Sequence, residues 1–269
     1  MADARASYLT DILTQYGLGS LTSWAEQAIV NDWSNEQFII ELYKRDEFRK
    51  RFPAIFQLEA KGRPPVSVDE YLAYEKYVAA QAAMWGLPLS KEEVDNMLAN
   101  EVSNVEVQAR FDLASEAMYE TPQEDINELI RMSNGSITSG QVMKYFMNPE
   151  KELGVLQSQF RQAQISGAAV RTGWGQLTQS QAERLQSTGM TRDQAKVGFA
   201  ELAKMDEVFS PFTQQEALIT PEEQVAFLAG DAEAATKIED RVRTRLAEFG
   251  GSAGFAQSRQ GFAVGSAQQ

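Results

Sequence analysis

The chain has 269 residues, of which 43% are hydrophobic and 23% charged, a composition typical of a globular protein with one large core or two smaller ones. It contains no cysteine and no histidine, which excludes disulfides, thiol catalysis, zinc fingers and Ser-His-Asp machinery. Lys and Arg total 25 against 38 Asp and Glu, and the formal charge of −13 opposes general attraction to nucleic acid or anionic lipid.

Helix-start signals recur along the chain. Each has a Ser or Thr followed three residues later by Glu or Gln, the pattern in which the two side chains satisfy each other's free backbone amides. The pattern predicts an all-α protein. The nine pairs are Ser34/Gln37, Ser67/Glu70, Ser90/Glu93, Ser103/Glu106, Thr121/Glu124, Thr138/Gln141, Thr178/Gln181, Thr191/Gln194 and Thr220/Glu223.

The first predicted helix runs from about Asp3 to Tyr16 and ends at the glycines that follow. Further helices are expected near residues 21–29 and after Ser34. Pro53 biases Phe52 away from helical geometry, so a turn is predicted there. A long helix follows, from Ser67 to about Trp85, with shorter helices beginning at Ser90 and Ser103.

The second half continues with helices from Thr121 and Thr138, and another is opened by Pro149. Two helical hairpins follow, the first from Thr178 and the second from Thr220; an ordinary pair of hairpins is favoured over a duplicated repeat. We therefore predict an irregular multi-helix bundle in three regions: an N-terminal helical region (1–172), a helical-hairpin region (173–249) and a Gly/Ala/Ser-rich C-terminal tail (250–269).

Candidate catalytic carboxylates are explained by local structure. The adjacent pairs Glu92/Glu93 and Glu222/Glu223 lie where helix capping and the helix dipole already favour acidic residues. The sequence contains no glycine-rich phosphate loop and no Asp-rich calcium loop of the EF-hand type. We expect no enzymatic activity, cofactor or metal. A peptidoglycan-cleaving domain with a single catalytic Glu remains an alternative.

The sequence shows no run of about 18 apolar residues for a membrane span, and its first residues lack the features of a signal peptide. Synthesis and folding in a cytoplasm are therefore expected.

Parts of the chain resemble structural proteins of tailed bacteriophages, over about half of its length. The motifs that carry the resemblance are Trp33-Ser34-x-Glu36-Gln37, Glu41-Leu42-Tyr43, Phe48-Arg49-Lys50-Arg51-Phe52-Pro53, Ser67-Val68-Asp69-Glu70-Tyr71, Trp85-Gly86-Leu87, Leu177-Thr178, Gly189-Met190-Thr191, Ala195, Gly198-Phe199, Leu202-Ala203 and Arg243-x-Arg245-Leu246-Ala247-x-Phe249-Gly250-Gly251.

The resemblance implies a non-enzymatic virion component associated with the portal, head-tail junction or tail, or an internal protein ejected with the genome. Its partners would be copies of itself and other virion proteins, with no specific nucleic-acid binding, and it would be made in the cytoplasm of the bacterial host. The alternatives are a virion-associated peptidoglycan-degrading enzyme, and an assembly chaperone or scaffold absent from the mature particle.

Three elements are candidate interfaces. The turn with Arg49, Arg51, Phe52 and Pro53 could meet an acidic neighbouring subunit, although a self-contained turn whose arginines pair with the chain's own carboxylates is favoured. The C-terminal tail, with Phe255 and Phe262, could become ordered on a partner. The N-terminal helix could pack on a partner helix instead of on its own bundle.

Overall fold

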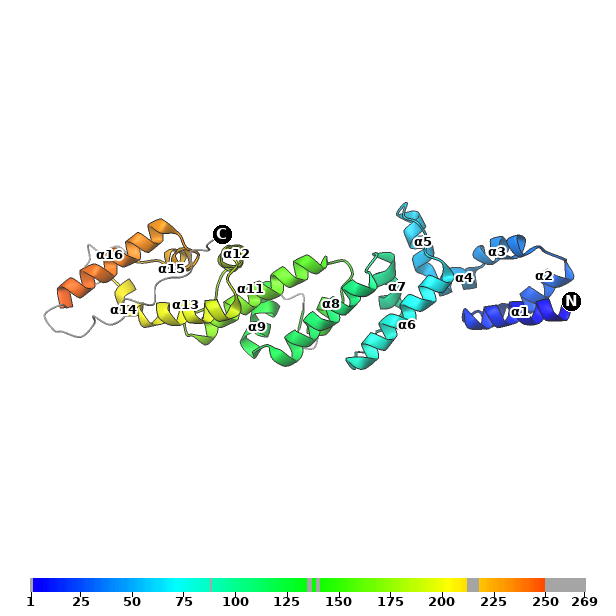
Figure 1. Cartoon of the computed structure of the whole chain (residues 1–269), viewed down its shortest axis with the longest axis horizontal. Coiled ribbons are helices and arrows are strands. Elements are labelled where there is room, and N and C mark those ends of the chain that lie inside the picture. Colours follow the sequence, from blue (N-terminus) through cyan, green and yellow to red (C-terminus); the bar gives the residue numbers. More distant parts are fainter. Residues whose placement is uncertain (1, 88, 135–136, 139–140, 212–217, 250–269) are drawn as a thin grey trace, which may run out of the picture. The chain divides into compact units, whose positions relative to one another are not determined.

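The computed structural model describes residues 2–87, 89–134, 137–138, 141–211 and 218–249. Within these ranges the chain is helical and contains no strand, which confirms the all-α prediction (Figure 1). The tail from residue 250 to residue 269, with Phe255 and Phe262, lies outside the described residues.

The chain forms two compact units that interleave in sequence. Unit 1 contains residues 1–120 and 140–156, and unit 2 contains residues 121–139 and 157–269.

Unit 1 contains one long helix, α6, and a series of shorter helices. Its elements are α1 (Ala2–Gln15), η1 (Gly19–Leu21), α2 (Thr22–Val30), α3 (Asn35–Tyr43), α4 (Asp46–Arg51), α5 (Pro53–Ala60), α6 (Val68–Met84), α7 (Lys91–Ala99), α8 (Asn104–Ser115), the π-helical turn η2 (Glu116–Glu120), α10 (Val142–Phe146) and the first residues of α11. Helix α1 packs on α2, α5 and α6 pack on α7, and α8 packs on α6 and α10.

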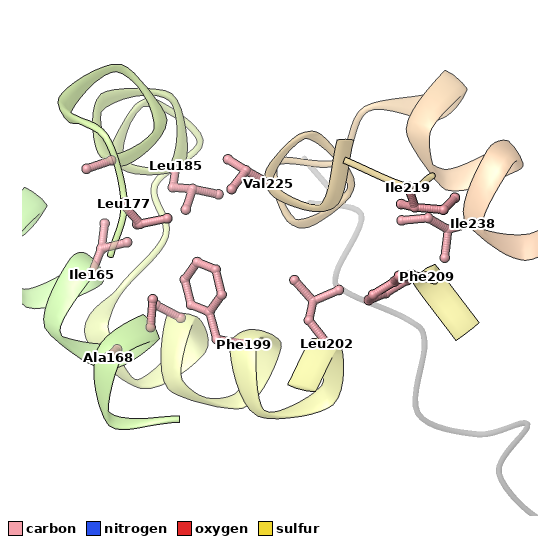
Figure 2. Close-up of a cluster of buried hydrophobic side chains, with 13 residues drawn as sticks. Ile165, Ala168, Leu177, Leu185, Phe199, Leu202, Phe209, Ile219, Val225 and Ile238 are labelled. Atoms are coloured by element: carbon pink, nitrogen blue, oxygen red, sulfur yellow. The ribbon is translucent and has the colours of Figure 1, made fainter. Parts of the chain in front are cut away.

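Unit 2 contains the rest of the chain. Its elements are α9 (Gln123–Met132), most of α11 (Leu153–Arg171), α12 (Gln179–Ser187), α13 (Arg192–Lys204), α14 (Asp206–Phe209), α15 (Pro221–Leu228) and α16 (Ala232–Phe249). Its core joins α11, both hairpins and the segments that lead into them, and in Figure 2 the side chains of Leu177, Leu185, Phe199 and Val225 point toward one another.

Two helical hairpins are present as predicted. Helices α12 and α13 are joined through Gly189, and α15 and α16 through Gly230, and both glycines have a positive φ (79° and 82°) that other residues adopt with difficulty. The first helices of the two hairpins, α12 and α15, pack on each other.

The predicted helix starts are confirmed at seven of the nine pairs. In these seven the Ser or Thr hydroxyl accepts a hydrogen bond from the backbone N–H three residues later, and at five of them the return bond completes the capping box. The seven begin at Ser34, Ser67, Ser90, Ser103, Thr178, Thr191 and Thr220.

The other two pairs do not cap the expected helices. Helix α9 has Pro122 as its N-cap residue, and because Pro122 is extended (ψ 148°) the helix begins at Gln123, with no side-chain cap. Helix α10 has Gln141 at its N-cap, so Thr138 lies outside it.

The division into units differs from the predicted boundary at 172/173. The loop at that point is held by Trp174, whose ring packs on Phe199 with centroids 5.0 Å apart and whose Nε1 donates to Gln224 at 2.6 Å. Because these partners lie on α13 and α15, the last turns of α11 belong with the hairpins. The boundaries fall at residues 120, 139 and 156.

Candidate functional site: the arginine-rich helix α4

The predicted basic turn is a junction between two short helices. Helix α4 ends at Arg51, Phe52 leaves the helical region (φ −125°, ψ 55°), and Pro53 opens α5 at its first position. A proline disfavours helical geometry in the residue before it and is well suited to a first helical turn, so Pro53 explains both changes. The departure of Phe52 from helical geometry is as predicted.

Arg51 points into unit 1 and is fully engaged there. Its two terminal nitrogens donate to the two carboxylate oxygens of Glu75, each at 2.6 Å, and its Nε donates to the Tyr16 carbonyl at 3.1 Å. The guanidinium also lies 4.8 Å from the ring centroid of Phe52. The hydrogen bonds that it donates to Glu75 raise the pKa of Arg51 above its already high value, so the guanidinium is charged at any physiological pH.

Phe52 is 0% exposed and lies at the centre of an aromatic cluster. Its ring contacts those of Tyr16, Phe48 and Tyr71, at centroid distances of 6.1, 5.0 and 5.1 Å. An aromatic side chain buried in this way stabilises its own fold, so Phe52 is a core residue of unit 1 and offers no surface to a partner.

A second layer of polar contacts surrounds the Arg51–Glu75 pair. The Tyr71 hydroxyl donates to Asp95 at 2.5 Å, and the Lys91 ammonium donates to the other oxygen of Asp95 at 2.6 Å and lies 3.7 Å from Glu75. Burial, together with the hydrogen bond to Asp95, raises the pKa of Tyr71. With two cations and two anions, the cluster is neutral overall, which suits a structural network that links α4, α6 and α7.

Of the remaining basic residues of this region, Arg49 and Lys50 face outward and Arg45 is half-buried. Arg49 and Lys50 are exposed, and the Arg49 guanidinium lies 4.6 Å from the ring centroid of Phe56. Arg45, the residue before α4, stacks 4.9 Å over the Trp24 ring, and its Nε atom is buried without a hydrogen-bond partner. The guanidiniums of Arg45 and Arg49 are therefore positioned by aromatic rings, with no carboxylate among their contacts in the described structure.

The structure thus separates the predicted interface residues. Arg51 and Phe52 face inward and Pro53 starts a helix, whereas Arg49 remains at the surface. A turn whose arginines pair with the chain's own carboxylates therefore describes Arg51 but not Arg49. Sequence reasoning missed Glu75, Lys91 and Asp95 as partners of the turn. All three residues lie far from Arg51 in the sequence, so no local pattern connects them with it. The sequence predicts only that arginines of the turn pair with some of the chain's surplus carboxylates.

The acidic pairs considered as catalytic candidates are engaged at helix starts. Glu93 accepts from the Ser90 backbone at 2.7 Å and from Lys144 at 3.3 Å, at the edge of a shallow surface hollow lined also by Glu92 and Asn96. Glu223 accepts from the Thr220 backbone at 2.8 Å and from Lys237. Burial raises the pKa of Glu93, but its hydrogen bonds from Ser90 and Lys144 together outweigh burial, so that pKa is lowered. The hydrogen bonds from Lys237 and the Thr220 backbone lower the pKa of Glu223. Both carboxyl groups therefore stay ionised.

Among the residues that the structure describes, no group of three or more acidic side chains is arranged to hold a metal ion. No helix in the described ranges combines the length and the apolar character needed to cross a bilayer. Comparison with protein-family models, with curated proteins and with solved structures finds no match for this chain.

Proposed function

We propose that the chain is a non-enzymatic structural component of a tailed-phage virion, associated with the portal, the head-tail junction or the tail, or carried inside the particle and ejected. The observation that carries the proposal is the resemblance of its motifs to virion structural proteins, in two groups that fall in the two units.

Several residues of the motifs that carry the resemblance cap helices or lie in the core. Ser34 and Ser67 cap α3 and α6, and Phe48, Phe52 and Tyr71 form the aromatic centre of unit 1. In unit 2, Thr178 and Thr191 cap the helices of the first hairpin. The resemblance therefore rests on residues that build the helices and the core, as expected for a shared structural subunit.

The proposal is tested in particles purified from a phage or induced prophage that encodes this sequence. We expect quantitative mass spectrometry to find the chain at a fixed copy number, and imaging without imposed symmetry to place that density at the portal or tail, or inside the particle. A chain present in the lysate but missing from finished particles would contradict the proposal and favour an assembly chaperone. Release of peptidoglycan fragments by the purified protein would favour a lytic enzyme.

A further inference from the structure

The outer face of α4 carries four charged residues in a simple order. Asp46 and Glu47 occupy the first turn, Arg49 and Lys50 the last turn, and all four are exposed. Phe48, at the middle of the helix, is 0% exposed and fixes the opposite face of α4 against the aromatic core.

None of these four residues forms an ion pair with another described residue of the chain. Elsewhere on the surface, charges one helical turn apart do pair, as in Lys44–Glu41 at 2.6 Å and Lys204–Glu201 at 2.7 Å. Asp46 and Lys50 have the spacing for such a pair and do not form one. Their hydrogen-bonding capacity is thus available to another molecule.

Helical geometry places the four charges symmetrically about the buried phenylalanine. At about 100° per residue, Asp46 and Lys50 lie within about 20° of the direction opposite Phe48, and Glu47 and Arg49 flank them on either side. The sequence of charges along the face is therefore negative, negative, positive, positive. Such a face is complementary to itself when a second copy lies antiparallel.

We propose that α4 is an isologous contact between two copies of this chain. A two-fold axis at the level of Phe48 sets Asp46 of one copy opposite Lys50 of the other. Arg49 then meets the same acidic turn, and Glu47 lies within reach of Lys50. This arrangement sets Asp46 and Lys50, at the centre of the face, against unlike charges, while Glu47 and Arg49 at its edges also approach their own symmetry mates. A parallel arrangement would oppose like charges along the whole face.

The surroundings of α4 also favour a second copy of the chain as its partner. The Arg49 guanidinium is already positioned over Phe56, so less side-chain freedom is lost on binding. Phe56 is itself held by a ring contact with Tyr43 on α3. In a chain of net charge −13, a locally neutral and self-complementary face lets two copies approach despite their overall repulsion.

Exposed ion pairs contribute about 0.2–1 kcal/mol each, so this contact is weak between two free chains and is weakened further by salt. Repetition within a particle would multiply it. The inference rests on the proposed function only in taking the chain to act as repeated copies. If the chain does not self-associate, the copy number measured in purified particles still tests the proposed function. If the chain is absent from particles, the self-association of the purified protein still tests this inference.

The test is sedimentation equilibrium of the purified full chain at low and high ionic strength, for the wild type and two charge-reversed variants. Arg49→Glu with Lys50→Glu makes the outer face of α4 wholly acidic, and Asp46→Lys with Glu47→Lys makes it wholly basic. We expect self-association of the wild type that weakens with salt, a loss of at least about tenfold in the association constant of each variant alone, and recovery when the two variants are mixed.

Recovery on mixing separates a broken contact from a broken fold, because a misfolded chain gains nothing from its counterpart. Arg161→Glu with Lys196→Glu, two exposed cations of unit 2, reverses the same charge elsewhere and should leave association close to wild type. A wild type that remains monomeric at every concentration and salt level would overturn the proposal. So would variants that associate like the wild type, or a mixture that fails to associate.

Discussion

The Arg110 guanidinium, which is 1% exposed, donates to the Phe146 carbonyl at 2.9 Å and thereby ties α8 to the end of α10. The same side chain donates to the carbonyls of Asn148 and Lys151, at 2.8 and 2.6 Å, and to Glu106 through two nitrogens. One arginine thus satisfies the last carbonyl of α10 and two carbonyls of the segment beyond it.

Replacement of Arg110 by Ala should destabilise unit 1 by about 3–5 kcal/mol, because it leaves three backbone carbonyls and Glu106 without their buried donor. Hydrogen exchange read by mass spectrometry should show faster exchange in α8 and α10. Arg161→Ala, at an exposed position of α11, is the matched control and should change stability by less than about 0.5 kcal/mol. Equal effects of the two substitutions would contradict the anchoring role of Arg110.

A methyl group at Gly167 should be poorly tolerated. Its Cβ would stand 1.9 Å from Oδ1 and 2.7 Å from Cα of Asp125, so the backbones of α9 and α11 would have to separate. We expect Gly167→Ala to lower the free energy of unfolding of unit 2 by about 3 kcal/mol or more, seen as a lower denaturant midpoint. Gly154→Ala lies on the same helix with nothing within 4 Å, and should be neutral or stabilising by up to about 1 kcal/mol. A tolerated Gly167→Ala would show that α9 and α11 are not in close contact.

The buried carboxyl of Asp125 predicts a specific pH dependence. Asp125 is 0% exposed, one of its oxygens accepts from Arg171, and the other has no hydrogen-bond partner. Burial, which outweighs the effect of Arg171, raises its pKa from 3.8 to about 6. A carboxyl that binds its proton more tightly in the folded state contributes stability that is fully present below about pH 4 and is lost as the pH rises through 6.

Asp125→Asn should therefore gain stability relative to the wild type as the pH rises from 4 to 7, by a change on the order of 3 kcal/mol. Urea unfolding across this range, followed by the fluorescence of Trp174 in unit 2, measures it. Glu223→Gln is the control of opposite sign. The contact with Lys237 lowers the pKa of Glu223, so the wild type should lose stability relative to that variant as the pH falls. A pH-independent difference between wild type and Asp125→Asn would contradict the raised pKa.

The two arginines of α4 should differ sharply when removed. Arg51→Ala leaves Glu75, whose side chain is 19% exposed, without its bidentate partner, and should cost about 2–4 kcal/mol. Arg49→Ala removes only an exposed contact with Phe56 and should cost less than about 1 kcal/mol. Chemical denaturation of both variants provides the comparison. A larger loss of unfolding free energy for Arg49→Ala than for Arg51→Ala would contradict the inward orientation of Arg51 and the outward orientation of Arg49.

Much of the fold was predictable because helix starts are encoded within four residues. Ser67 and Glu70 begin α6 where expected, and the helix ends at Met84, next to the predicted Trp85. Thr121 and Glu124 have the same pattern and fail, because the extended proline between them moves the helix start. Local rules were therefore reliable except where a neighbouring residue changed the backbone.

The partners within the charged clusters could not be predicted in the same way. Arg51 meets Glu75 across 24 residues, and Arg131 reaches the Leu177 carbonyl across 46. Such pairs depend on how helices pack, and the chain offers each arginine many carboxylates and carbonyls. The division into two interleaved units could not be predicted for a related reason, since the loop sequence around Gly173 gives no sign that Trp174 is anchored on α13 and α15.

The interleaving of the two units has a consequence for synthesis. Unit 1 cannot be completed until residue 156 has left the ribosome, and by then α9 has already emerged without the α11 residues against which Asp125 and Glu128 pack. During synthesis, α9 therefore has its buried face exposed while the residues that complete unit 1 are being made. A fragment cut at residue 120 would therefore lack α10, and one cut at residue 172 would leave α9 and α11 without the hairpins that cover them.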